Sequence, residues 1–320
     1  MKKIIGYSLL TLLIISCSAS SNDSSDNLTP MVSKVLIYDA SSKKINRINL
    51  NTGQLTPVSP QFDAFTNTYK CDELQFHYHS ASGCYYALDY NLQPPNVIEN
   101  QGRIVKYNKA NQTISYIPLS NYTRSSFLSE ILILPNNDTY ILDYDFFPNQ
   151  ARLEKVDLTT GQISLYTTFS ESELNEGINS MTYDSVRNSI LYTDDTKYRF
   201  YYRNFNDGFN HVWPTNSNKF TNIVYANNYL YTYDIVQHKI FKAGQDNLWT
   251  AFSDEFVPFD VNNNTYSHKE MNLIYNPEQD ELIGFHDRSN KMFRISLQTG
   301  AVTVLQLPYG NYSSPFIEVD

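Results

Sequence analysis

Three glutamates hold matching places in the sequence, and together they could bind a metal ion. Each of them stands at the start of a predicted β-strand: Glu73, Glu130 and Glu270. Carboxylate oxygens are the preferred ligands of Ca²⁺ and other hard cations, so three strand starts whose oxygens converge could hold one divalent ion. The simpler interpretation is that the starts of these strands are exposed to solvent and therefore tolerate acidic residues. We therefore expect no cofactor, with Ca²⁺ or another divalent cation as the alternative.

Two histidines offer a second, incomplete set of ligands. His77 and His79 are two residues apart on a predicted strand, so both side chains should leave the same face. Such a pair can begin a Zn²⁺ or Cu²⁺ site, but a complete site requires further ligands. The sequence has no H-E-x-x-H, C-x-x-C, G-x-S-x-G or P-loop motif. It therefore carries no catalytic signature, although an enzyme site can also be assembled from distant loops.

Aromatic residues are frequent in the long segments between predicted strands. Exposed rings beside Asn and Asp suit the binding of sugars, which stack on aromatic faces and hydrogen-bond around their rims. The same rings could instead pack over the ends of the strands, and for any single ring this is the simpler interpretation. The candidates for ligand binding are Phe62, Phe65, Tyr69, Phe146, Phe147, Phe256, Phe259 and Tyr266.

The elements that would position these residues come from a repeated strand–turn–strand motif. Residues 45–56 alternate apolar and polar side chains, turn at Gly53 and resume as a second strand. Period-two alternation indicates a strand with one buried face, and Gly supplies the positive φ that a tight turn needs. Copies of the motif begin at residues 45, 104, 153, 200, 240 and 292.

A second hairpin precedes most copies of the motif. Examples with polar turns are residues 134–141, 183–191 and 225–231. Each unit therefore has four antiparallel strands. The copies follow one another at intervals of roughly 40 to 59 residues, which fits the blades of a β-propeller.

The two ends of the chain are predicted to form one blade together. Residues 35–40 form a first strand with no hairpin before it, and residues 315–320 form a spare strand after the last unit. The two partial units together have about 40 residues, the length of one blade. Pairing them would close the ring and remove its open edges. We therefore predict an all-β propeller of six four-stranded blades over residues 34–320; seven blades is the alternative, because the interval before residue 104 is long.

The predicted domain resembles bacterial six-bladed β-propeller proteins with repeats of the NHL and YVTN type. The resemblance rests on the repeat itself, including the Asn49 or Asp157 that precedes the Thr-Gly turn. In such propellers one face commonly carries the site, which implies a functional face formed by the long connections. These connections are residues 61–70, 91–101, 144–150, 170–176 and 254–268.

A basic residue also recurs in the third strand of most units. We interpret these cations as a solvated outer face. They are Arg47, Lys106, Lys155, Lys242 and Arg294.

The N-terminus is typical of a secreted, lipid-anchored protein. Two lysines precede an apolar run over residues 4–15, which is too short for a comfortable transmembrane helix and indicates a signal peptide. The end of this run, followed by Cys17, resembles the bacterial lipoprotein signal and implies that residues 1–16 are removed and Cys17 is lipidated. Residues 17–33 are small and polar, as in a flexible tether. The alternative is an ordinary secretory signal with an incidental Cys.

The predicted location limits the possible partners of the protein. The N-terminus predicts a lipid anchor in the outer membrane, on the periplasmic side or the cell surface. The formal charge of −9 and the lack of a basic patch argue against nucleic acid, and we expect a monomer. In an oxidising compartment Cys71 and Cys84 could form a disulfide, although they do not lie directly opposite each other in the predicted hairpin.

Two functions remain open after this reading of the sequence. The first is a binding or scaffold lipoprotein that holds a protein or glycan ligand at its long-loop face. The alternative is an enzyme, such as a metal-dependent lactonase or hydrolase, with carboxylates at the mouth of the channel. A channel mouth with three or more converging oxygens would favour the enzyme, and a mouth without them would favour binding.

Overall fold

The structure is a computed structural model, and its described residues belong to one compact unit, Ser33–Asp320. No helix among them is long and apolar enough to cross a membrane. The described residues are 33–64, 74–91, 101–120, 126–145, 150–169, 178–194, 199–213, 219–258, 271–286 and 289–319.

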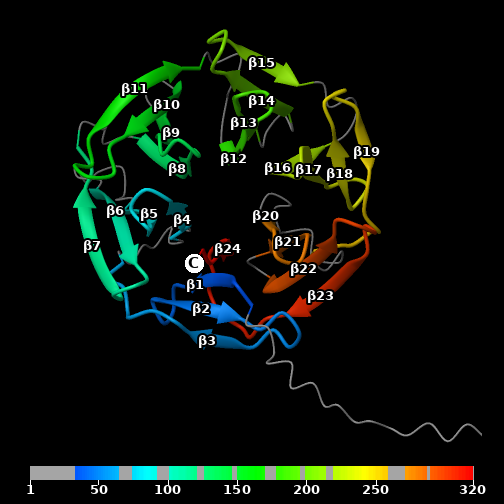
Figure 1. The fold of residues 1–320 in the computed structure, drawn as a ribbon, viewed down its shortest axis with the longest axis horizontal. Coiled ribbons are helices and arrows are strands. Elements are labelled where there is room, and N and C mark those ends of the chain that lie inside the picture. The colour runs from blue at the N-terminus through cyan, green and yellow to red at the C-terminus, as the bar shows by residue number, and fades with distance from the viewer. Residues whose placement is uncertain are drawn as a thin grey trace, which may run out of the picture. The chain divides into compact units, whose positions relative to one another are not determined.

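Six antiparallel sheets of four strands form a ring, with the first strand of each sheet innermost and the fourth at the rim (Figure 1). The first sheet contains β24 (Phe316–Ile317), β1 (Val35–Asp39), β2 (Lys44–Ile48) and β3 (Leu55–Pro57). The second contains β4 (His77–His79), β5 (Cys84–Asn91), β6 (Gln101–Asn108) and β7 (Thr113–Pro118). The third contains β8 (Ser126–Ile133), β9 (Thr139–Asp145), β10 (Gln150–Val156) and β11 (Ile163–Thr168).

The remaining three sheets follow the same order along the chain. The fourth contains β12 (Ile178–Asp184), β13 (Ser189–Asp194), β14 (Arg199–Asn204) and β15 (Asn210–Trp213). The fifth contains β16 (Phe220–Ala226), β17 (Tyr229–Asp234), β18 (Lys239–Ala243) and β19 (Trp249–Ala251). The sixth contains β20 (Met271–Asn276), β21 (Glu281–His286), β22 (Lys291–Ser296) and β23 (Val302–Gln306). The six-bladed propeller is confirmed, and the alternative of seven blades is wrong.

The hydrophobic core lies between neighbouring blades rather than at the centre of the ring. Between the first two blades, Tyr38 and Phe62 meet edge to face with ring centroids 5.7 Å apart, and Phe62 lies 5.4 Å from Phe76. The middle strands of each blade are covered on both sides, so β21 is buried along its whole length. Large aromatic rings fill these wedge-shaped gaps well because each buries much apolar area.

In the first, third and sixth blades, the glycine of the repeated motif packs against the backbone of the blade before it. Gly161 has a φ of +72°, and a Cβ there would overlap the backbone oxygen of Pro118 in the preceding blade. The carbonyl of Gly161 accepts a hydrogen bond from the Ser120 backbone N–H at 2.9 Å. Gly300 repeats this contact against Phe252. Only glycine satisfies both the left-handed φ and the close approach.

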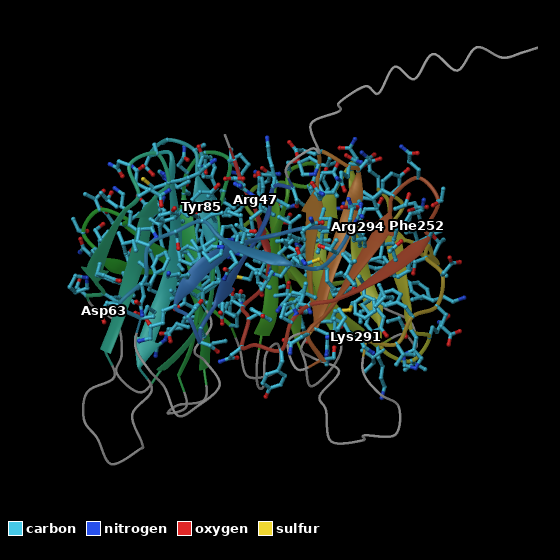
Figure 2. All side chains as sticks on the ribbon, turned by 90° about the horizontal axis from the view of Figure 1, so that it is seen from below. Arg47, Asp63, Tyr85, Phe252, Lys291 and Arg294 are labelled. Atoms are coloured by element: carbon cyan, nitrogen blue, oxygen red, sulfur yellow. The ribbon has the colours of Figure 1, made fainter. Side chains whose placement is uncertain are left out.

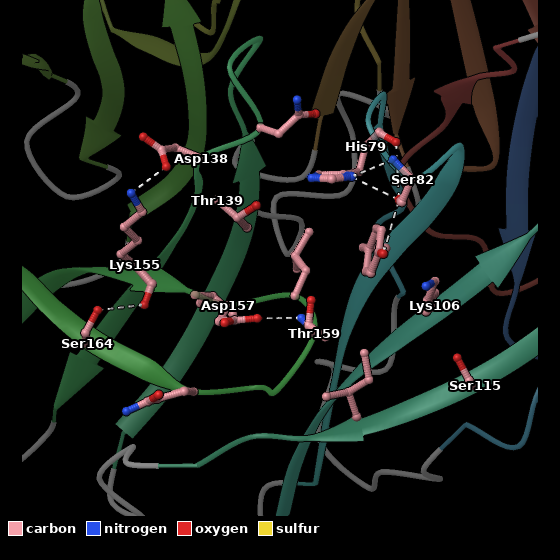
Figure 3. Close-up of a pocket in the computed structure, with 16 residues that line it drawn as sticks. His79, Ser82, Lys106, Ser115, Asp138, Thr139, Lys155, Asp157, Thr159 and Ser164 are labelled. Carbon is pink, nitrogen blue, oxygen red and sulfur yellow. Dashed lines mark hydrogen bonds and ion pairs between the residues drawn. The ribbon is translucent and has the colours of Figure 1, made fainter.

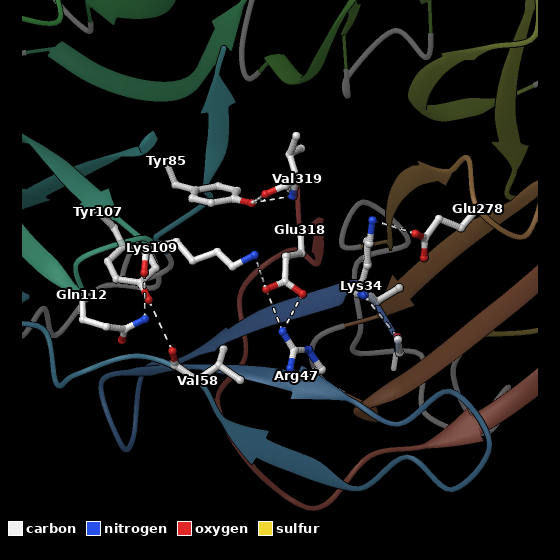
Figure 4. A network of polar contacts seen from close by, with 12 residues as sticks. Lys34, Arg47, Val58, Tyr85, Tyr107, Lys109, Gln112, Glu278, Glu318 and Val319 are labelled. Carbon is white, nitrogen blue, oxygen red and sulfur yellow. Dashed lines mark hydrogen bonds and ion pairs between the residues drawn. The ribbon is translucent and has the colours of Figure 1, made fainter. Parts of the chain in front are cut away.

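The C-terminal strand closes the ring as the sequence predicts. β24 pairs with β1 through Leu36 and Phe316 and the adjacent residue pair. Beyond it, the buried Glu318 carboxylate accepts hydrogen bonds from Arg47 at 2.6 Å and lies 2.9 Å from the Lys109 ammonium, which belongs to the second blade (Figure 4). The Val319 N–H donates to the Tyr85 hydroxyl at 2.6 Å. The closure therefore joins the first and second blades as well as the two ends of the chain.

The propeller chain enters and leaves at one end of the ring. Lys34, just before β1, forms an ion pair with Glu278 in the short β20–β21 turn at 2.8 Å. The longer connections, such as that between β3 and β4, join strands at the opposite end. In the side view, Arg47 and Tyr85 lie towards the first end, and Asp63 and Lys291 lie towards the second (Figure 2).

Candidate functional site

The inner strands place one polar residue at the same register position in every blade. β8, β12 and β16 each have a β-bulge, which puts Glu130, Ser180 and Asn222 directly before the residues that pair again with the second strand. Asn272 occupies the equivalent position in β20. When the pairing registers of β4 and β24 are continued towards the preceding residues, Gln75 and Ser314 occupy it in the other two blades. We call this set the polar ring: Gln75, Glu130, Ser180, Asn222, Asn272 and Ser314.

The polar ring surrounds a cavity in the central channel. Its volume is about 300 Å³, at the lower end of the range for small-molecule sites. Every ring member except Glu130, whose side chain lies outside the described structure, lines this cavity. His77 joins them from β4, and Phe76, Ile274 and Ile317 supply apolar wall. The ring lies near the starts of the inner strands, so it is closer to the end of the propeller that carries the long connections.

Three buried polar atoms at this cavity have no hydrogen-bond partner among the described residues. They are the Asn222 Nδ2, the Ser314 Oγ and the His77 Nε2. A buried polar group without a partner costs about 1–3 kcal/mol, so native proteins usually pair such groups with protein, water or ligand. The residues that carry these atoms all line one cavity, so the three unpartnered groups gather at a single place where a polar ligand could bind.

Asn222 is held in a strained backbone conformation at this site. Its φ is +50°, and it is the one non-glycine residue inside a described strand with a positive φ. The residue is only 2% exposed. The neighbouring blade supports the bulge, since the Ile223 N–H donates to the Ser180 Oγ at 3.3 Å. Strain of this kind costs about 1–3 kcal/mol and persists where the surroundings enforce it, often at functional sites.

The described lining of the cavity carries no formal charge. Burial lowers the pKa of His77 to about 4, so its imidazole is neutral at neutral pH. The other polar members are amides and hydroxyls, which donate and accept hydrogen bonds. This chemistry suits a ligand with hydroxyl or amide groups.

Of the three predicted glutamates, one lies within the described strands and two lie outside the described residues. Glu130 lies in β8 at the ring position, whereas Glu73 and Glu270 lie outside the described residues, each two residues before a ring member. Among the described residues no group of three or more His, Cys, Asp or Glu could hold a metal ion. The cation site stays a prediction.

The two histidines do not share a site. His77 lines the channel cavity, but His79 lines a groove between the second and third blades. There its Nδ1 lies 2.9 Å from the Ser82 Oγ. β4 has only three residues, and the turn begins directly after it, so the side chains of His77 and His79 lie in different surroundings.

Two of the aromatic candidates are core residues. Phe62 is 2% exposed, and Phe256, at 6% exposure, packs on Phe293 with ring centroids 4.9 Å apart. A ring covered in this way has no face left for a sugar, so the packing interpretation holds for both. Phe65, Tyr69, Phe146, Phe147, Phe259 and Tyr266 lie outside the described residues and stay predictions.

The predicted disulfide and the lipidation site also stay predictions. Cys84 is a buried free thiol that donates to the Ser82 carbonyl at 3.2 Å. Cys71 and Cys17 lie outside the described residues.

Sequence reasoning missed the polar ring because it looked for ionisable groups. Most members are small and neutral, and such residues are common everywhere in the chain. The signal that could have found them is a polar residue directly before an apolar one at the start of each unit, as in Asn222-Ile223 and Asn272-Leu273. Only an alignment of all repeats to one register makes this visible.

Comparison with solved structures agrees with the fold. A chain in the nidogen/laminin complex superposes with a TM-score of 0.61 at 12% identity, covering 89% of this chain and 98% of that chain. A "putative 6-phosphogluconolactonase" from Bacteroides fragilis NCTC 9343 gives 0.58 at 13%, covering 89% and 97%. A streptogramin B lyase gives 0.50 at 16%, covering 87% and 81%. These identities show the fold alone, which is that of a six-bladed β-propeller. No family model and no curated sequence matches the chain.

Proposed function

We propose that the protein is a membrane-tethered binding protein whose channel cavity receives a neutral, hydroxyl-rich unit of a glycan. The observation that supports this is the polar ring with its three unpartnered buried atoms. A cavity of about 300 Å³ has room for one small unit, and sugar hydroxyls can both donate and accept on every side. A protein ligand would have to offer the same groups from a single projecting side chain.

The position of the chain ends supports a role at the membrane. Lys34 lies at the short-turn end of the propeller, whereas the polar ring lies near the opposite end. If Cys17 carries the lipid anchor, the tether joins the propeller at the end away from the ligand cavity. The point of attachment then leaves the cavity end uncovered, so a glycan can reach it.

The binding proposal is tested by replacing a ring hydroxyl that has no protein partner. We expect the purified propeller to bind neutral glycans on an array and Ser314→Ala to bind about tenfold more weakly, because one hydrogen bond contributes roughly 1–1.5 kcal/mol. Thermal stability should not fall, since the Ser314 Oγ bonds to nothing in the described protein. Ser41→Ala, in the exposed β1–β2 turn, is the matched control. An array without glycan binding, or equal affinity for both variants, contradicts the proposal.

The membrane proposal has its own test. We expect Cys17→Ser to release the protein from the membrane fraction, because the acylated residue is lost. Fractionation with metabolic acyl labelling of the wild-type chain measures this. A mutant that stays in the membrane, together with an unlabelled wild type, would refute lipidation.

A metal-dependent lactonase or hydrolase remains the second candidate. The observation that favours it is the position of Glu130 in the ring, where a carboxylate could join a cation site. Elemental analysis of the purified propeller, with thermal shift on adding Ca²⁺, Mn²⁺ or Zn²⁺, separates the two functions. A bound ion would favour the enzyme, and no ion and no shift would remove it.

A further inference from the structure

The recurring cation of the third strand has a specific partner in most of the blades that carry it, although Lys155 is also exposed to solvent. Arg47 pairs with Glu318, Lys155 with Asp138, and Arg294 with Glu281 at 2.9 Å. The ammonium of Lys242 instead lies over the rings of Tyr229 and Phe252, 5.2 Å and 4.8 Å from their centroids.

Lys106 and Lys242 are the two cations of this series that have no carboxylate partner among the described residues, and Lys106 has the weaker ring contact of the two. It lies opposite Tyr86 in the register, as Lys155 lies opposite Tyr140 and Arg294 opposite Ile283. Its ammonium is 5.8 Å from the centroid of the Tyr86 ring, and no carboxylate in the described part of the chain pairs with it.

The missing acid has a simple explanation in the register. In the third and sixth blades the partner stands two residues before the residue opposite the cation, as Asp138 and Glu281. The same place in the second blade is Cys84, which is buried and uncharged. The preceding turn, Ser80 to Gly83, brings no acid either. The Lys106 ammonium therefore lacks the carboxylate counterion that the equivalent cations of the third and sixth blades have.

The side chain of Lys106 lines a groove of about 670 Å³ between the second and third blades (Figure 3). The acids of the groove are already engaged, since Asp138 pairs with Lys155 and Asp157 accepts the Thr159 N–H at 2.7 Å. The groove also contains exposed hydroxyl and amide side chains, among them Ser115 and Gln162. It therefore offers a ligand the Lys106 ammonium and neutral groups that donate and accept hydrogen bonds.

We infer that this groove binds an acidic sugar residue, with Lys106 as the partner of its carboxylate. The hydroxyl and amide side chains of the groove, among them Ser115 and Gln162, supply further hydrogen bonds to the sugar hydroxyls. The negative charge of Asp138 and Asp157 also selects against a doubly charged phosphate. The site is separate from the channel cavity and does not depend on the proposed function.

The test uses two sugars that differ only in the carboxylate. D-Glucuronate and D-glucose are titrated into the full-length protein and followed by NMR or calorimetry. We expect saturable binding of glucuronate and at least tenfold weaker binding of glucose. Lys106→Gln should remove this preference, whereas Lys106→Arg, which keeps the charge, should retain it.

Two controls keep the outcome decisive. Lys242→Gln removes the equivalent cation of another blade and should leave glucuronate binding unchanged. Ser314→Ala changes only the channel cavity and should also have no effect, so failure of the glycan proposal is distinguishable from failure of this one. Equal binding of both sugars, no binding of glucuronate, or unaltered preference in Lys106→Gln would overturn the inference.

Discussion

Deleting residues 315–320 should destabilise the whole propeller rather than fray one end. The deletion removes Phe316, whose ring packs 5.5 Å from those of both Phe76 and Tyr85. It also leaves Arg47 and Lys109 without the buried Glu318 carboxylate. Burying one large apolar side chain contributes about 1.5–3 kcal/mol. Losing the Glu318 carboxylate adds less than the roughly 3–5 kcal/mol of a fully buried pair, because Arg47 and Lys109 are partly exposed. Together these losses rival the roughly 5–15 kcal/mol net stability of a domain.

The measurement combines thermal unfolding with size-exclusion chromatography, because the bare edge of β1 should also recruit other chains. A deletion of equal length in the predicted tether, residues 20–25, is the control and should melt like the wild type. Glu318→Gln removes only the charge of the ion pairs, so its melting temperature should lie between those of the C-terminal deletion and the tether deletion. A C-terminal deletion that stays monomeric and melts normally would show that strand pairing between the termini does not stabilise the ring.

Gly161→Ala should be the most harmful single substitution among the turn glycines. The φ of +72° disfavours any residue with a Cβ by about 1–2 kcal/mol. In addition, the new methyl group would meet the backbone oxygen of Pro118, which a side-chain movement cannot relieve. The turn must shift away from the preceding blade, so the inter-blade hydrogen bond to Ser120 is lost as well. We expect a total cost of at least about 4 kcal/mol, which is exceptional for one substitution.

Two other glycines separate backbone strain from the clash. Gly208 has the same φ of +72°, but its Cβ would meet only the end of the Arg203 side chain at 3.9 Å. Gly83, at +63°, has nothing within 4 Å. In urea unfolding, Gly208→Ala and Gly83→Ala should each cost only about 1–2 kcal/mol. If all three variants unfold alike, the left-handed turn alone explains the glycine, and the contact between blades contributes nothing.

The architecture could be predicted because its causes are local and repeated. Alternation of apolar and polar residues, a turn glycine and a unit length each act within a few residues of the chain, and the copies confirm one another. Closure by residues 315–320 followed from the lengths of the two partial units. Even Gly161, predicted as a turn residue from its Thr-Gly setting, has the expected positive φ.

The sites depended on the tertiary structure, because they consist of relations between blades. Asn222 and Ser314 stand 92 positions apart in the numbering, and they meet only when the ring closes around the channel. Whether a polar atom is left unpaired is decided by every neighbour that packing brings to it, which no local pattern encodes. In the same way, Phe62 turned out to be core and not a ligand surface.

Lys106 shows this division within a single residue. Its type and its place in the repeat can be read from the sequence, where it looks like four other cations. What distinguishes it is the residue across the sheet: acids stand there in two other blades, and the buried Cys84 stands there in its own. Sequence determines which charges the chain carries, whereas folding decides which of them find a partner, because an ion pair requires both groups at one place.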